Sequence, residues 1–115
     1  MQRAQRLRSP ADFRRVREVA PRGWSHPLLM VHVAPNDLGC PRVGITVSGR
    51  VGNAVVRNRV RRRLREALTA RFAELPATSD VVVSARPASA RASWAELNAA
   101  LDSVLNRARR ATRPS

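Results

Sequence analysis

The sequence predicts an α+β fold in which helices pack on a small mixed sheet. Residues Val43–Ser48 alternate between apolar and small polar side chains, which is typical of a half-buried strand. The next segment has an apolar residue at every fourth position and predicts an amphipathic helix, with Val56, Val60, Leu64 and Leu68 on its buried side. Asp80–Ala85 then predicts a buried strand, so the chain contains a strand–helix–strand unit that favours parallel pairing.

The chain is expected to begin with a helix. Ser9 is a favourable N-cap, Pro10 suits the first turn, and Asp12 stands where a carboxylate can complete the cap. Pro21 and Gly23 should end this helix.

Two strands should follow the first helix. Leu28–Ala34 is apolar on both sides, as a central strand would be, and Pro35–Gly39 has turn residues. Val43–Ser48 is the second strand, and there is room for a short extra strand near Arg22 to Ser25.

The long helix should begin after Asn53, a plausible N-cap, and run to about Glu74, because Pro76 cannot continue it. Ser93 and Glu96 have the spacing of a capping box and predict a last helix. Its apolar stripe consists of Leu97, Leu101, Val104, Leu105 and Ala108.

Length and composition set the class of protein. The 115 residues fit one domain, residues 1–115, with flexible ends expected at about 1–8 and 110–115. No apolar run approaches 18 residues, and the basic N-terminus has no apolar segment after it, so we expect a cytoplasmic protein with no membrane partner. Cys40 is the single cysteine, which excludes an internal disulfide.

The charge points to a polyanionic partner. All 22 basic residues are arginine, and the formal net charge is +14. Six arginines stand between Arg57 and Arg65, with no acid among them. Their mutual repulsion costs helix stability, which a polyanion would offset, so a merely solvated face is the weaker interpretation. Charge alone leaves RNA and DNA both open.

No catalytic or metal-binding grouping is recognisable. The eight acids are scattered, and no phosphate-binding, zinc-protease, nucleophile-elbow or CxxC motif occurs. His32 is interpreted as a half-buried strand residue. Phe13 is either a core anchor or a stacking platform for a base. The small residues Thr46 and Ser48 form either a solvated sheet surface or a floor that a ligand backbone can approach closely.

The segment RVGITVSGRVGNAVVRNRVRRRLREAL resembles the signature region of the bacterial ribonuclease P protein subunit. Its hallmark is Arg57-Asn58-Arg59 followed by the basic helical run Arg61–Glu66. The resemblance covers about residues 6 to 110. It implies a compact αβββαβα two-layer sandwich with a left-handed βαβ crossover, similar to domain 2 of ribosomal protein S5.

The resemblance also implies a function. The chain would be one subunit of a ribonucleoprotein that removes the 5′ leader of precursor tRNA. The RNA subunit would bind the Mg²⁺ ions and carry the chemistry, so the protein would hold neither catalytic residues nor a metal. Its partners would be the catalytic RNA and precursor tRNA, with no obligate protein partner.

The matching positions divide into two expected sites. The RNA-binding residues would be Arg50, Asn53, Arg57, Asn58, Arg59, Arg61, Arg62 and Arg65. The cleft for the substrate leader would be lined by Phe13, Arg17, Thr46 and Ser48. Many family members have a second aromatic residue where this chain has Arg17. Two alternatives stay open, namely a structural RNA-binding protein of the ribosomal or RNA-chaperone type and a protein-only nuclease.

Overall fold

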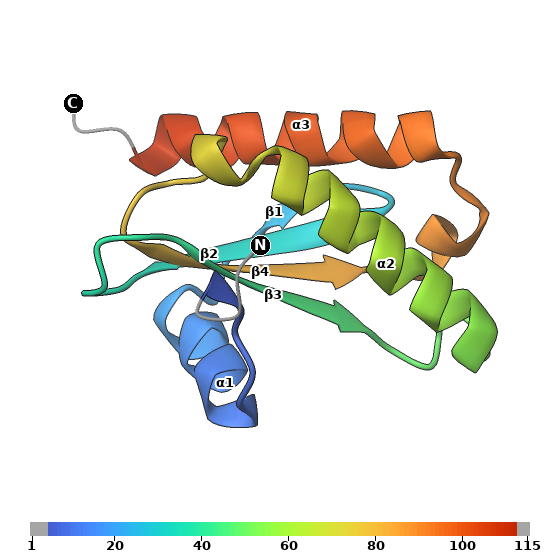
Figure 1. Ribbon diagram of the computed structural model, residues 1–115, viewed down its shortest axis with the longest axis horizontal. Coiled ribbons are helices and arrows are strands. Elements are labelled where there is room, and N and C mark those ends of the chain that lie inside the picture. Colours follow the sequence, from blue (N-terminus) through green and yellow to red (C-terminus); the bar gives the residue numbers. More distant parts are fainter. Residues whose placement is uncertain (1–4, 113–115) are drawn as a thin grey trace.

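The computed structural model describes residues 5–112 and has the predicted order of elements (Figure 1). Two short 3₁₀ helices, η2 (Phe72–Glu74) and η3 (Pro87–Arg91), join the main elements. The helices and strands are α1 (Pro10–Val19), β1 (Trp24–Ser25), β2 (Leu29–Pro35), β3 (Arg42–Val47), α2 (Ala54–Ala70), β4 (Ser79–Ala85) and α3 (Trp94–Thr112).

One mixed sheet organises the molecule, with strand order β1-β2-β4-β3. β2 and β4 are the central strands and pair antiparallel, whereas β3 is an edge strand that pairs parallel with β4. In Figure 1 both β3 and β4 point to the right, and α2 passes in front of them as the chain moves up from β3 to β4. This crossover is left-handed, as expected from the resemblance and against the usual right-handed rule.

The main core lies between the sheet and α2 with α3. The alternate residues of each strand that face these helices, such as Val31, Val43 and Val83, are buried against Leu64, Leu68 and other helix residues. α1 packs on the opposite face of the sheet, at one end (Figure 1). The sandwich therefore has two full layers, and α1 covers only part of the second face. The smaller cluster beneath α1 comprises Leu7, Val16, Ala34 and Val82, with Phe13 packed against it.

The predicted helix caps are confirmed. The backbone N–H of Asp12 donates to Ser9 Oγ (3.1 Å), and the N–H of Val56 donates to Asn53 Oδ1 (3.0 Å). At α3, Ser93 and Glu96 form the reciprocal bonds of a capping box. The short extra strand predicted near Arg22 to Ser25 is β1.

The predicted end of α2 at Glu74 is wrong. The helix ends at Ala70, and the backbone N–H of Arg71 donates to Leu68 O and Thr69 O. The chain then tightens into η2, because the last turn of a helix can use i→i+3 bonds to satisfy its carbonyl groups before the chain reverses. Pro76 therefore stands beyond a separate turn, not directly after the helix.

The expected flexible ends at 1–8 and 110–115 stay a prediction, and residues 1–4 and 113–115 lie outside the described part of the chain. Within that part, the N–H of Leu7 donates to Val43 O (2.9 Å) and the Leu7 side chain is buried. α3 continues to Thr112.

Candidate nucleic-acid interface

The arginines of α2 point in three directions. Residues four apart lie on one side of a helix, so Arg57, Arg61 and Arg65 form one row. This row faces the outer edge of β3, where Arg61 and Arg65 line a pocket. Arg59 and Arg63 form a second row, which faces η3. Arg62 is exposed between the two rows.

The second row holds η3 and the start of α3 in place. Arg59 Nη2 donates to Ala90 O (3.0 Å), and Arg63 Nη1 lies 3.4 Å from Ala92 O. In the first row, Arg61 Nη1 donates to Asn58 Oδ1 (2.9 Å), which fixes the direction of that guanidinium. Arg59 therefore has a structural bond in addition to its predicted contact with RNA.

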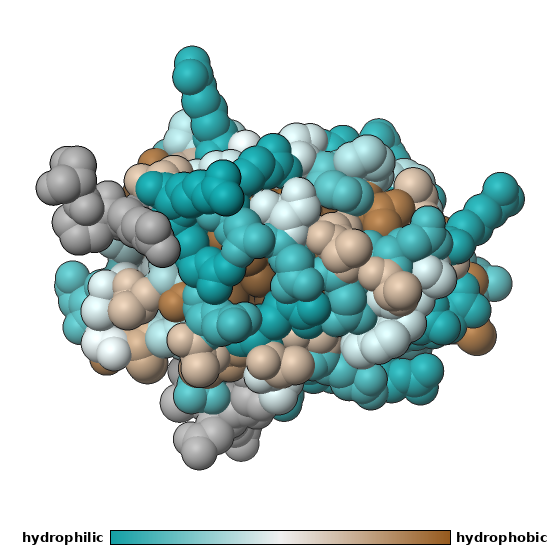
Figure 2. Space-filling view, turned by 90° about the horizontal axis from the view of Figure 1, so that it is seen from above, coloured by the Kyte–Doolittle hydropathy of each residue, from teal (hydrophilic) through white to brown (hydrophobic). Residues whose placement is uncertain are grey.

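The basic face has no internal neutralisation. Within residues 5–112, none of the six arginines from Arg57 to Arg65 forms a salt bridge. Arg50 and Asn53 are exposed in the segment that leads into α2. Figure 2, which views the molecule from the side of α3, shows mostly hydrophilic surface with small apolar patches. A surface of guanidinium groups without carboxylate partners suits a chain of phosphates, because a guanidinium can donate two parallel hydrogen bonds.

A pocket at the β3 edge joins the two expected sites. Its lining combines arginines of α2 with Phe13 and apolar residues of β3, and consists of Arg6, Leu7, Phe13, Val43, Ile45, Arg61 and Arg65. Arg61 and Arg65 were assigned to the RNA-binding site and Phe13 to the leader cleft. The structure therefore brings residues of both sites together.

Phe13 packs on Gly44. A Cβ atom built at Gly44 would lie 2.4 Å from Phe13 Cε1 and 2.6 Å from Cζ, a spacing that no side chain permits. Phe13 is half-buried, so it anchors α1 to the sheet and still contributes to the pocket wall. Gly44 is thus a seat for the ring, and the open part of this sheet face begins only at Thr46.

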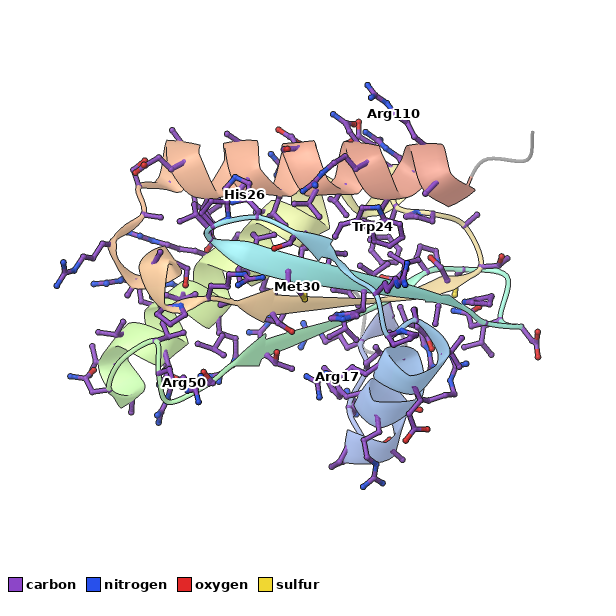
Figure 3. The ribbon with its side chains drawn as sticks, turned by 180° about the vertical axis from the view of Figure 1, so that it is seen from behind. Arg17, Trp24, His26, Met30, Arg50 and Arg110 are labelled. Atoms are coloured by element: carbon purple, nitrogen blue, oxygen red, sulfur yellow. The ribbon has the colours of Figure 1, made fainter. Side chains whose placement is uncertain are left out.

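Beyond α1 this face of the sheet is uncovered (Figure 3). Cross-strand pairing places Met30, Ser84 and Thr46 in one row, and Thr46 Oγ1 donates to Ser84 Oγ (2.9 Å). Arg17 extends from α1 at one end of the uncovered region, and Arg50 stands at the other. The row of half-buried, small or flexible side chains between two arginines can accept an extended anionic chain.

A buried ion cluster fixes α1 to the other end of this face. Asp80, on β4, is fully buried and accepts hydrogen bonds from Arg42 Nε (2.9 Å), Arg42 Nη2 (2.8 Å), Arg15 Nη2 (2.7 Å) and Asn36 Nδ2 (2.8 Å). Burial opposes ionisation, but the bonds from Arg42, Asn36 and Arg15 outweigh it and hold the pKa of the Asp80 carboxyl below its usual range. The cluster links α1, the β2–β3 connection and both parallel strands.

His32 lies beside Arg17 on the face that α1 covers. It is buried, more fully than the half-buried strand position that the sequence predicted, and its Nδ1 has no hydrogen-bond partner in the described part of the chain. Burial and the positive charge of Arg17 lower the pKa of this imidazole and favour its neutral form.

None of the helices in residues 5–112 is long and apolar enough to cross a bilayer. Among the same residues, no three His, Cys, Asp or Glu side chains stand close enough to hold a metal ion together.

Comparison with known proteins decides the family. A family model described as Ribonuclease P matches residues 1–109. The chain belongs to the ribonuclease P protein family. A relative from Herpetosiphon aurantiacus, named ribonuclease P protein component, is 44% identical over 108 residues, which are 94% of this chain and 87% of the relative.

Solved ribonuclease P proteins share the fold. The protein from Staphylococcus aureus superposes with a TM-score of 0.84 at 28% identity, over 92% of this chain and 96% of that one. The protein from Thermotoga maritima superposes with a TM-score of 0.80 at 25% identity, over 89% of this chain and 96% of that one.

Sequence reasoning missed part of the candidate site of this ribonuclease P protein. Arg6, Ile45, Met30 and Ser84 were not among the expected site residues, although they line the pocket or the open sheet face. The strand order alone brings Met30 and Ser84 beside Thr46. The only local signal for Ser84 is that it is polar in the otherwise apolar strand segment Val81–Ala85, and its place beside Thr46 follows from the register of β4 with β3.

Proposed function

We propose that this ribonuclease P protein binds the catalytic RNA through α2 and the 5′ leader of precursor tRNA through the face that carries α1. The observation that supports it best is the row Arg57, Arg61 and Arg65, which has no acidic partner within residues 5–112 and opens toward the pocket at the β3 edge. A duplex or folded RNA presents phosphates at a density that such a row can match.

The single-stranded leader would run over the open part of the sheet. Phe13 offers a ring edge for an unpaired base, Thr46 and Ser48 offer hydroxyl groups, and Arg17 and Arg50 offer charge at the two ends. Because this chain has Arg17 where many relatives have an aromatic residue, its leader binding would depend more on phosphate contacts and less on stacking.

The chemistry would belong to the RNA subunit, which would bind the Mg²⁺ ions that assist phosphodiester hydrolysis. Three of the acids in the described residues already have structural partners, which supports this division of labour. Asp80 is bound by three side chains, Asp102 pairs with Arg71, and Glu96 completes the cap of α3. These carboxylates hold the fold together. We place this work in the cytoplasm, where the substrate RNA is made.

Reconstitution tests the proposal. The protein, its cognate catalytic RNA, and both together are each incubated with 5′-labelled precursor tRNA at low Mg²⁺. We expect rapid cleavage only with both components. Cleavage by the protein alone would support a protein-only nuclease. If the folded protein binds the RNA tightly without raising the cleavage rate, the chain is a structural RNA-binding protein instead.

A further inference from the structure

Trp94 differs from the other aromatic residues of the chain. Phe13, Trp24 and Phe72 are each half-buried and pack against a hydrophobic cluster. The side chain of Trp94 is 45% exposed and belongs to neither cluster. An indole left on the surface of a strongly basic protein is available to a partner.

The position of Trp94 follows from two contacts between neighbouring helices. α2 and α3 run in the same direction side by side (Figure 1). Arg63 contacts Ala92 O near the start of α3, and Arg71 Nε donates to Asp102 Oδ1 (2.6 Å) further along. Trp94 comes two residues after Ala92, so it begins α3 next to the turn of α2 that carries Arg62 and Arg63. The first turn of α3, which carries the exposed Trp94, therefore adjoins the basic surface of α2.

The segment that presents Trp94 is fixed in advance. Arg59 and Arg63 hold the carbonyls of Ala90 and Ala92 against α2, as described above. The capping box of Ser93 and Glu96 fixes the first turn of α3. A platform held by this many bonds loses little conformational freedom when a ligand stacks on it.

The surrounding charge selects the partner. Exposed Arg62 and Arg91 lie on the α2 side and just before Trp94. Two carboxylates are also near: Glu66 is exposed on α2, and Glu96 accepts the backbone N–H of Ser93. The arginines and the aromatic ring together match an RNA strand with an unpaired base, since phosphates pair with guanidinium groups and any base can stack on indole.

We propose that Trp94 is a stacking platform for an unpaired base of the RNA that α2 binds, so that the RNA interface continues over η3 onto the start of α3. The proposal rests on the proposed function of α2. It assigns a contact to a helix that the arginine signature does not include.

Three variants test it, with binding to the catalytic RNA measured at several salt concentrations. We expect Trp94→Ala to weaken binding by about 5- to 100-fold, because stacking on one side chain has that range of effect. Trp94→Phe should keep most of the affinity. The slope of log Kd against log salt should be unchanged in both, because stacking releases no counterions. The matched control Arg62→Ala should flatten the slope.

Tryptophan fluorescence gives an independent readout that does not depend on how well the alanine variant folds. The emission of the wild-type protein should be quenched on addition of RNA, and Trp94→Phe should abolish most of that quenching because only Trp24 remains. If Trp94→Ala binds the RNA with unchanged affinity, or if Trp94→Phe is quenched as strongly as the wild type, Trp94 is not a stacking platform. A flattened salt slope in Arg62→Ala would in that case still support RNA binding by α2. If all three variants bind the RNA with unchanged affinity and an unchanged salt slope, both proposals are overturned.

Discussion

The Asp80 cluster should be a principal source of stability for the α1 side of the fold. Asp80→Asn keeps the shape of the side chain but removes the charge and one acceptor oxygen. The buried face then holds two guanidinium groups, from Arg15 and Arg42, that have lost their carboxylate. Breaking a buried ion pair by removing one partner costs about 3 to 5 kcal/mol.

The expected magnitude lies at the low end of that range. The Arg42 side chain is 20% exposed and the Arg15 side chain 41%, so water can solvate part of both groups after the change. We expect a loss of about 3 kcal/mol in the free energy of unfolding. For a domain of this size that corresponds to a melting temperature lower by roughly 12 °C.

Urea and thermal unfolding followed by circular dichroism measure the effect. Asp102→Asn is a matched control, since it removes the same charge from a pair whose carboxylate side chain is 57% exposed. That pair should contribute less than about 1 kcal/mol. If the two variants lose equal stability, or if Asp80→Asn loses less than about 1 kcal/mol, the cluster does not have the role described here.

Three further predictions follow from the same geometry. Gly44→Ala should lower the free energy of unfolding in urea by about 1 to 3 kcal/mol, because the added Cβ would displace the Phe13 ring. Gly49→Ala is the control, since its Cβ makes only an ordinary contact and its stability should be nearly unchanged. Hydrogen bonds from their arginine partners lower the pKa values of Asp80 and Asp102. The stability that these pairs contribute is therefore present above the ordinary carboxyl pKa and is lost as the pH falls below about 4, which urea unfolding at a series of pH values measures. Phe13→Ala should reduce affinity for precursor tRNA more than for mature tRNA, and equal loss on both would make Phe13 only a core anchor.

The elements were predictable because local patterns define them. The caps at Ser9, Asn53 and Ser93 each depend on residues three positions apart, and the apolar periods of α2 and α3 are repeated over several turns. The end of α2 was missed because the choice between another α-turn and η2 depends on how the chain reverses toward Leu75, which is buried in the core.

The assembled site was less predictable than its parts. The arginine signature identified α2, but nothing local shows that Arg59 and Arg63 turn toward η3 while Arg61 turns toward Phe13. The Asp80 cluster joins residues up to 65 positions apart. Such contacts depend on strand order and register, which local sequence patterns do not reveal.

The salt dependence of binding between this protein and its catalytic RNA tests the role of α2 most directly. If about six phosphates are neutralised, affinity should fall by about a thousandfold between roughly 50 and 200 mM salt. The double variant Arg57→Ala/Arg61→Ala should flatten the slope of log Kd against log salt by about two units, one for each lost phosphate contact. Arg71→Ala, whose guanidinium is already paired with Asp102, should leave the slope unchanged. An unaltered slope in the double variant would show that this row of α2 does not touch phosphate.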